Sequence, residues 1–286
     1  TWANDDLLYT AYGDGRGFQP FVETKLSMGL CTLAGPAEAP RGVNLRSETF
    51  ERKGEGARGA KASGLLMVDG VLYLFARNLE NAQVAWSADS GRTWTWSEWR
   101  FTTSFGYPTP LNFGPNYAGA RDEFAYLYSH NSNSAYERAD SMVLARVPAK
   151  RIREREAYEF FVRLEAGEPV WSRDIAERGP VFTNPGRCYR SSVGYSSGLK
   201  RDLWCQTGLG ADTRFKGGLA IYDAPEPWGP WTVAFSTEEW DVGPGETSCL
   251  PTKWMSDDGC TLHLVFSGDD SFSVRRGTIR LTTTER

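Results

Sequence analysis

The chain of 286 residues is 40% hydrophobic and 24% charged, and 13% of its residues are aromatic. Its formal net charge is −4, with 32 basic against 36 acidic residues and no basic block, which excludes the electrostatic footprint of a nucleic-acid-binding protein. No apolar run approaches the ~18 residues of a membrane-spanning helix, and aromatic and β-branched residues along the whole chain exclude disorder.

Short apolar runs bounded by Gly, Asp, Asn and Pro predict β-strands from one end of the chain to the other. Such runs cover residues 7–12 (LLYTAY), 71–75 (VLYLF) and 262–266 (LHLVF). Helical periodicity is rare. The charged stretch at 148–158 is expected to form only a short helix or a solvated hairpin, since its acidic residues balance its basic ones. The chain is therefore predicted to be all-β.

A pattern of strand, turn and strand recurs along the chain. It occurs at both ends, at 1–15 and 253–270, and returns at 64–78, 122–131 and 192–208. An aromatic residue closes the second strand of each copy: Tyr12, Phe75, Tyr128, Trp204 and Phe266. The intervals between these aromatic residues are 63, 53, 76 and 62 residues. This spacing predicts a five-bladed β-propeller of four-stranded antiparallel blades, formed by residues 1–286 as a single domain.

Two blades carry recognisable corners. The segment SADSGRTW at 87–94 matches the Asp box of sialidase-like propellers, for which a structural role is expected. Asp89 would cap backbone N–H groups, Gly91 would take a positive φ and Trp94 would pack under the hairpin. Residues 223–231 place Pro and Trp at the matching corner of blade four. Blade one is expected to be truncated at its N-terminus, because the counterpart of residues 246–252 has no equivalent before Thr1.

The cysteines give little sign of metal or redox chemistry. The five of them form no CxxC pair and have no His at zinc-ligand spacing, so no metal site and no cofactor are predicted, although a structural calcium ion stays open. Cys188 and Cys205 flank a predicted hairpin. They either bridge across it or stay buried as free thiols, and the second reading is favoured.

Propellers bind ligands over the mouth of the central channel, with the loops between second and third strands and the loops that enter the first strands. In this chain these loops concentrate carboxylates, cationic side chains and aromatic rings, the chemistry of a carbohydrate site. The candidate catalytic residues are Asp14, Glu246 and His130. The candidate substrate-binding residues are Lys61, Arg77, Tyr107, Tyr189, Arg190, Arg214 and Asp269.

These candidates also have structural interpretations. Asp14 lies between two glycines and is able to cap a turn, and Asp269 with Asp270 is able to form an Asx-turn or a cation site. Lys61 and Arg190 either meet an anionic ligand at the mouth or neutralise its carboxylates. His130 is expected in a mouth loop, where a histidine is able to bind substrate or transfer a proton.

The opening LLYTAYGDG at 7–15, the repeated hairpins and the closing FSGDD at 266–270 resemble a family of bacterial five-bladed propellers. This glycoside hydrolase family was long a domain of unknown function and is endo-D-arabinanase-like. The resemblance covers most of the chain as architecture and reaches motif level only near Asp14. It implies a catalytic carboxylate at Asp14, with the partner carboxylate upstream on the inner strand, before Thr1, unless an acid such as Glu246 replaces it.

The leading prediction is a glycoside hydrolase that cleaves a polysaccharide or oligosaccharide by carboxylate acid/base catalysis. Carboxyl groups ~6.5–9.5 Å apart would imply inversion, and ~5 Å would imply retention. One alternative is a lyase that acts on a uronate-containing glycan, with His130, Tyr107 or Tyr189 as base. Another is a non-catalytic carbohydrate-binding propeller. We expect an extracellular or periplasmic monomer that binds neither nucleic acid nor membrane.

Overall fold

The computed structural model describes residues 1–209, 217–243 and 245–281. Within these ranges the chain forms twenty β-strands and seven short 3-10 turns, and no α-helix. The prediction of an all-β chain is confirmed. No helix in the described ranges is long and apolar enough to cross a membrane.

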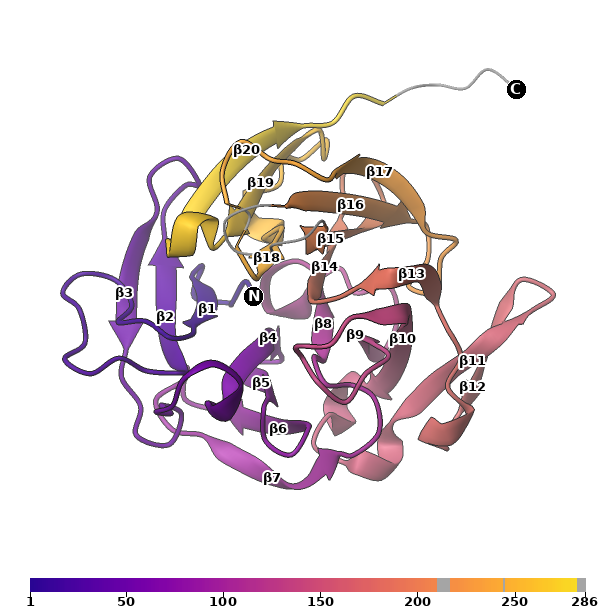
Figure 1. Ribbon diagram of the computed structural model, residues 1–286, viewed down its shortest axis with the longest axis horizontal. Coiled ribbons are helices and arrows are strands. Elements are labelled where there is room, and N and C mark those ends of the chain that lie inside the picture. The colour runs from indigo at the N-terminus through magenta and orange to yellow at the C-terminus, as the bar shows by residue number, and fades with distance from the viewer. Residues whose placement is uncertain (210–216, 244, 282–286) are drawn as a thin grey trace.

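Consecutive antiparallel strands form sheets that follow one another around a central axis (Figure 1). The first sheet contains β1 (Leu8–Tyr12), β2 (Gly29–Ala34) and β3 (Arg41–Leu45). The second contains β4 (Lys61–Val68), β5 (Val71–Arg77), β6 (Ala82–Ser87) and β7 (Thr95–Phe101). The last contains β18 (Ser248–Cys249), β19 (Thr261–Phe266) and β20 (Ser273–Thr278) and lies beside the first.

A ten-stranded sheet completes the ring. Its first part contains β8 (Thr109–Asn112), β9 (Phe124–His130), β10 (Ala139–Pro148), β11 (Glu159–Glu165), β12 (Glu168–Ser172) and β13 (Phe182–Cys188). Its second part contains β14 (Ser191–Ser196), β15 (Arg201–Leu209), β16 (Gly218–Ala224) and β17 (Thr232–Thr237). A parallel contact between β8 and β14 joins the two parts, with Val193 opposite Leu111.

This ring of antiparallel sheets fits a β-propeller, and the predicted hairpins are present. β4 turns directly into β5, where Val68 pairs with Val71, and β14 turns into β15, where Ser196 pairs with Arg201. Four strands in every blade are not confirmed, because the first and last sheets have three strands each within the described residues.

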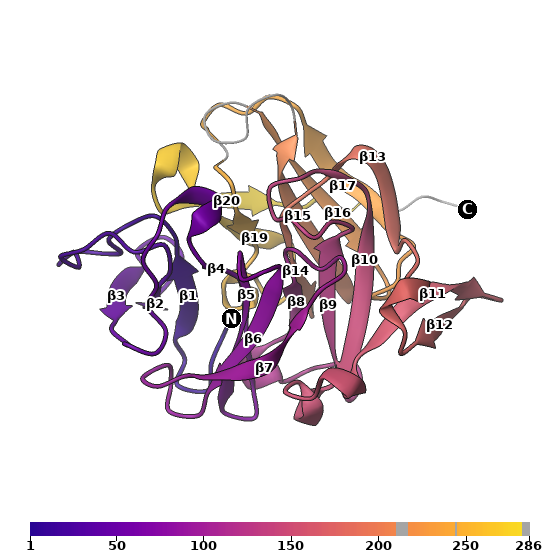
Figure 2. The ribbon, with the colours of Figure 1, turned by 60° about the horizontal axis from the view of Figure 1, so that its bottom comes forward.

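The charged stretch at 148–158 forms two 3-10 turns, η3 (Ala149–Arg151) and η4 (Arg155–Ala157), in agreement with its lack of helical periodicity. After them β11 and β12 form a hairpin that projects from the ring (Figures 1 and 2). This hairpin was not predicted.

The aromatic residues that close the second strands belong to the core. Phe75, Tyr128, Trp204 and Phe266 are buried, whereas Tyr12 is only partly buried. The ring of Trp204 lies 6.0 Å from that of Tyr128 and 5.2 Å from that of Trp231, centroid to centroid. Edge-to-face and tilted contacts of this kind add to the free energy gained from burial of the rings. The aromatic surplus of the sequence is therefore largely structural.

The turn at 87–94 is held by a closed set of hydrogen bonds. The carboxylate of Asp89 accepts from the backbone N–H of Thr93 at 2.9 Å and from its hydroxyl at 2.6 Å. The indole N–H of Trp94 donates to the carbonyl of Gly91 at 2.9 Å, and Trp94 is buried. The φ of Gly91 is +85°. The conformations expected for Asp89, Gly91 and Trp94 are thus confirmed.

Gly91→Ala is expected to lower the free energy of unfolding by about 1–3 kcal/mol. A Cβ at this position would lie 2.7 Å from Leu30 and 2.9 Å from Leu45, in addition to the strain of a positive φ. Gly70→Ala is the matched control, because its φ is +75° and a Cβ there meets no atom within 4 Å. Denaturant titration of both variants measures the difference, and equal losses would mean that packing around Gly91 contributes nothing.

All five cysteines are free thiols, so the bridge between Cys188 and Cys205 does not form. Cys188 lies on β13, paired with Ala139 of β10, while the thiol of Cys205 on β15 is 3.2 Å from the hydroxyl of Ser192. The two residues belong to different strand pairs and have different neighbours. Cys188 and Cys205 are both buried, as the favoured reading expected.

Candidate functional site

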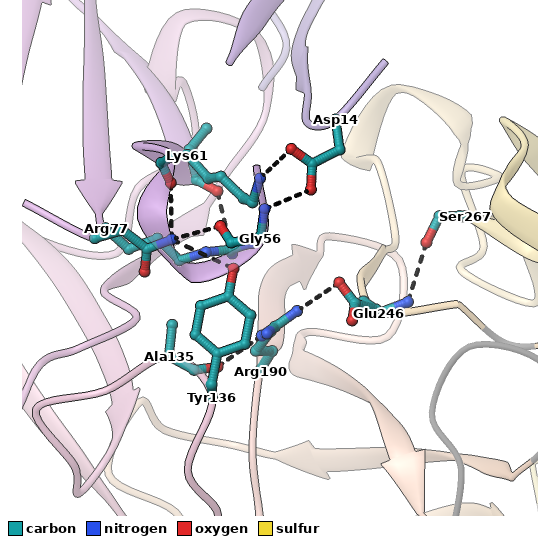
Figure 3. Close-up of polar contacts among 12 residues, drawn as sticks. Asp14, Gly56, Lys61, Arg77, Ala135, Tyr136, Arg190, Glu246 and Ser267 are labelled. Carbon is teal, nitrogen blue, oxygen red and sulfur yellow. Dashed lines mark hydrogen bonds and ion pairs between the residues drawn. The ribbon is translucent and has the colours of Figure 1, made fainter. Parts of the chain in front are cut away.

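Loops at one end of the axis bring together charged residues from four parts of the ring (Figure 3). Asp14 follows β1, Lys61 begins β4, Arg77 ends β5, Arg190 precedes β14 and Glu246 precedes β18. In Figure 2 this end is the upper one, where η1 (Gly56–Arg58, violet) and η7 (Gly268–Asp270, yellow) lie. The prediction that these five residues occupy one mouth agrees with their placement.

Asp14 is fixed by the first residue of β4 and by η1, which precedes that strand. Its Oδ1 accepts a hydrogen bond from Lys61 Nζ at 2.6 Å, and its Oδ2 accepts from the backbone N–H of Gly56 at 3.3 Å. The Lys61 side chain is 7% exposed, whereas that of Asp14 is 35% exposed. Because an ammonium group is costly to bury without an anion, Lys61 holds the carboxylate in place while one side of Asp14 stays open to solvent.

Glu246 is held in a similar way on the other side of the mouth. Its Oε2 accepts a hydrogen bond from Arg190 Nη1 at 3.0 Å, and its backbone N–H donates to Ser267 Oγ at 3.1 Å. The Arg190 side chain is fully buried and that of Glu246 is 40% exposed. Arg190 also donates from Nε to the carbonyl of Ala135 at 2.7 Å and lies 4.4 Å from the ring centroid of Tyr136.

Arg77 is buried beside this pair. Its Nη1 donates to the carbonyl of Ala62 at 3.3 Å, and its guanidinium lies 4.9 Å from the ring centroid of Tyr107. Its Nε has no hydrogen-bond partner in the described part of the chain. Burial, and after it the positive charge of Arg190, lowers the pKa of Arg77 below its usual value.

His130 and two of the predicted tyrosines lie under the mouth loops and are almost fully covered. His130 is 0% exposed, Tyr107 is 5% exposed and Tyr189 is 7% exposed. The Nε2 of His130 is 2.7 Å from the carbonyl oxygen of Ser134, and burial lowers its pKa to about 4, so the ring is neutral near pH 7. These three side chains are therefore covered by the mouth loops, as Arg77 and Arg190 are.

Asp269 binds the loop that precedes β18 and does not form the local Asx-turn that the sequence left open. Its Oδ1 accepts from the backbone N–H of Gly243 at 3.2 Å, its own N–H donates to the carbonyl of Gly243 at 3.3 Å, and its φ is +47°. These bonds hold the start of the loop that leads to Glu246. Arg214, the remaining candidate, lies outside the described residues.

Two contributors to the site were not predicted. Tyr136 covers Arg190 and accepts a hydrogen bond from Asn78 Nδ2 at 3.3 Å, and Gly56 donates to Asp14. Tyr136 lies between β9 and β10, in a loop of the class that the mouth prediction used, but the predicted segment stopped at Asn131. Three glycines at 54–59 were the available signal for a backbone that approaches a neighbouring loop closely.

Two surface cavities of about 390 Å³ lie away from these residues, one lined in part by Thr49 and Arg92 and the other by Glu38 and His263. Within the described ranges, no three His, Cys, Asp or Glu side chains are grouped so that they could hold a metal ion.

No protein-family model and no curated protein sequence matches the chain. Solved structures do. The β-xylosidase RS223 has a TM-score of 0.55 at 13% identity, over 99% of this chain and 91% of the xylosidase. A family 43 β-xylosidase/α-arabinofuranosidase from a compost microbial metagenome has a TM-score of 0.52 at 11% identity, over 95% of this chain and 86% of that one. A putative exo-β-1,3-galactanase from Bifidobacterium bifidum S17 has a TM-score of 0.53 at 12% identity, over 97% of this chain and 85% of that one.

This chain shares their fold. At such low identities the likeness concerns the path of the backbone and not the chemistry of the side chains.

Proposed function

We propose that this protein is a glycoside hydrolase that cleaves a polysaccharide or oligosaccharide at the mouth of the propeller. The observation that carries the proposal is the pair Asp14 and Glu246. The two carboxylates come from different sheets, each is bound by a cation that is at least nine-tenths buried, and each keeps more than a third of its side chain exposed. Most glycoside hydrolases use two carboxyl groups, held in place and accessible to the substrate, to cleave the glycosidic bond.

In the proposed mechanism, one carboxyl group protonates the glycosidic oxygen while the other acts on the anomeric side, as a base toward water or as a nucleophile. Hydrogen bonds from other loops fix both groups before substrate arrives: Lys61 and Gly56 bind Asp14, and Arg190 binds Glu246. Such preorganisation lowers the entropic cost of reaching the transition state.

We also infer that the propeller has five blades. Divided at the parallel contact between β8 and β14, the ten-stranded sheet gives two units, which join the three other sheets. We interpret the turn at 87–94 as a sialidase-type Asp box, on the hydrogen bonds of Asp89 and the buried Trp94. The resemblance of the sequence around Asp14 to endo-D-arabinanase-like propellers supports the same family of activities, as do the solved glycosidases with this fold.

The lyase alternative is less well supported, because burial lowers the pKa of His130 to about 4, which makes it a weak base. Burial raises the pKa of Tyr107 and Tyr189 above the usual value, so both rings keep their proton near pH 7. We propose a monomer that acts outside the cytoplasm, since polysaccharides are too large to enter a cell intact.

A screen over neutral and acidic polysaccharides tests the function, with reducing ends and ultraviolet absorbance measured in the same samples. A hydrolase releases reducing ends without new absorbance, whereas a lyase also creates an absorbing unsaturated product. Binding of a glycan with neither signal would point to a non-catalytic propeller and would overturn the proposal.

Asp269→Ala is expected to lower kcat/KM about tenfold, because the loop before Glu246 loses a hydrogen bond to a carboxylate worth roughly 1.5–3 kcal/mol. Asp269→Asn is the control. It keeps an oxygen acceptor for Gly243 and tolerates the positive φ, so its kcat/KM is expected to stay near that of the wild type. Steady-state kinetics of both variants provide the measurement, and a matching loss in Asp269→Asn would argue against a positioning role.

A further inference from the structure

Positive charge exceeds negative charge among the buried groups of the site. The side chains of Lys61 and Arg190 are 7% and 0% exposed, and Arg77 is 4% exposed as a residue. Asp14 pairs with Lys61, and Glu246 pairs with Arg190. In the described part of the chain, no carboxylate lies within ion-pair distance of Arg77, and the charge of Glu246 reaches it only from farther away. Three buried cations therefore share two carboxylates.

The hydrogen-bonding capacity of the two arginines is also unfilled. A guanidinium carries five N–H donors, and a buried donor without an acceptor costs about 1–3 kcal/mol. Arg77 Nε and Arg190 Nη2 are both buried without a partner in the described residues. The like charges of the two arginines also act on each other, since Arg190 helps to lower the pKa of Arg77. The cost of burying these two arginines would be lower if a bound ligand accepted their free hydrogen bonds and supplied negative charge.

Tyrosine rings restrict how a ligand can meet these arginines. Arg77 lies against Tyr107, and Arg190 lies against Tyr136 and Tyr189, at 4.4–5.0 Å from guanidinium carbon to ring centroid. These cation–π contacts cover one face of Arg77 and pack against Arg190, so a ligand would have to meet the N–H groups. Arg190 Nε and Nη1 already donate to Ala135 and Glu246, and the donors without a partner in the described residues are Arg77 Nε and Arg190 Nη2. Glu246 lies beside Arg190 in Figure 3 and keeps 40% of its side chain exposed.

We infer that Arg77 and Arg190 form a subsite for an acidic sugar, a uronate unit whose carboxylate accepts hydrogen bonds from the two guanidinium edges. The inference rests on the proposed function, and it names the substrate class of that site. A planar carboxylate matches the fork of guanidinium donors, whereas a neutral hydroxyl supplies no charge.

A binding comparison that does not require cleavage tests the inference. Oligogalacturonides and glucuronic-acid-substituted xylo-oligosaccharides are titrated calorimetrically into the full chain, beside the same oligosaccharides with their carboxyl groups methyl-esterified. The free acid of at least one pair is expected to bind about tenfold or more tightly than its ester, as for a charge-assisted hydrogen bond. Equal affinity for acid and ester in every pair would overturn the inference.

Substitutions test whether the arginines cause the tighter binding of the free acid. Arg77→Met is expected to remove most of the difference between acid and ester, and Arg77→Lys, which keeps the charge but not the fork, is expected to keep part of it. Arg163→Met is the matched control, because it removes an equal charge from an exposed arginine paired with Glu165. If Arg77→Met does not fold, Arg77→Lys decides. An unchanged preference in both variants, or an equal loss in Arg163→Met, would overturn the assignment.

The calorimetric comparison also includes a sulfated oligosaccharide that carries no carboxylate. If it binds as tightly as the uronate oligosaccharide, the subsite is not specific for a carboxylate. The outcome is also separable from the proposed function. Cleavage of a neutral glycan with no preference for acids would overturn only the acidic subsite, whereas acid-selective binding without cleavage of any glycan would overturn only the hydrolase.

Discussion

Asp14→Asn is expected to lower kcat on the cleaved glycan by about 10²–10⁴-fold, and Glu246→Gln by a similar factor, as for the loss of an acid or base catalyst. The two substitutions preserve the size of the side chains and an oxygen that accepts from Gly56 or Arg190. They remove the ability to exchange a proton. Each variant is therefore expected to keep the fold and much of the substrate affinity while turnover falls.

Steady-state kinetics and the pH dependence of kcat/KM provide the measurement. If the pair supplies both acid and base, the wild-type profile is bell-shaped and each variant loses one limb. Glu159→Gln is the matched control, because that carboxylate also pairs with an arginine, Arg146, and lies outside the mouth. Wild-type turnover in Asp14→Asn, or an equal loss in Glu159→Gln, would remove the catalytic role from the mouth carboxylates.

Asp202→Asn is expected to stabilise the protein near pH 8, by up to about 4 kcal/mol, and to change its stability little at pH 4. Asp202 lies on β15, is 1% exposed, and neither of its carboxylate oxygens has a hydrogen-bond partner in the described ranges. Burial raises its pKa to about 7, against the opposing effect of Arg121. The asparagine is uncharged at every pH and so avoids the cost of a buried anion.

The direction follows from proton linkage. Asp202 ionises with a pKa near 3.9 in the unfolded chain and near 7 in the folded one, so the folded state binds the proton more tightly. Its contribution to stability is complete below about pH 4, decreases as the pH rises, and is lost above about pH 7. Denaturant titrations at pH 4, 6 and 8 measure this trend, and the variant is expected to lack it.

Asp223→Asn is the control for this experiment. Asp223 pairs with Arg201 and accepts a hydrogen bond from Thr232 at 2.6 Å, so its replacement is expected to destabilise the chain, not to stabilise it. Parallel pH profiles for the wild type and Asp202→Asn would show that Asp202 does not carry the predicted penalty.

The hairpins were predictable because their signals are local. Alternation of apolar residues and acidic or glycine turns fixed β4, β5, β14, β15 and β19 to within a few residues. The number of strands in the first and last sheets is a property of tertiary contacts, and no local pattern carries it. The projecting β11–β12 hairpin was missed for a related reason, since its outer half is exposed and shows little apolar alternation.

The mouth was predicted in outline from the positions of charged residues at strand ends, and Asp14, Lys61, Arg77, Arg190 and Glu246 do converge there. Exposure was harder to predict. Whether a ring such as Tyr107 faces the ligand or the core depends on the loop that lies above it. The burial of a side chain that several distant segments cover is therefore not predictable from local sequence. Asp202 is an example, because nothing in RDLWCQ at 201–206 indicates that its carboxylate is buried.

The first and last sheets, which carry Asp14 and Glu246, are not joined by a backbone ladder in the described structure. They meet through side chains. Leu8 and Leu33 of one sheet pack with Trp254 and Val265 of the other, and the rings of Phe18 and Phe272 are 5.2 Å apart. Polar contacts cross the same boundary, because Trp254 Nε1 donates to the carbonyl of Gly35 at 3.2 Å and Lys253 forms an ion pair with Asp6. Side-chain volume and these directed contacts together set the gap between the two sheets. The separation of the two carboxylates therefore depends on side chains that lie outside the mouth.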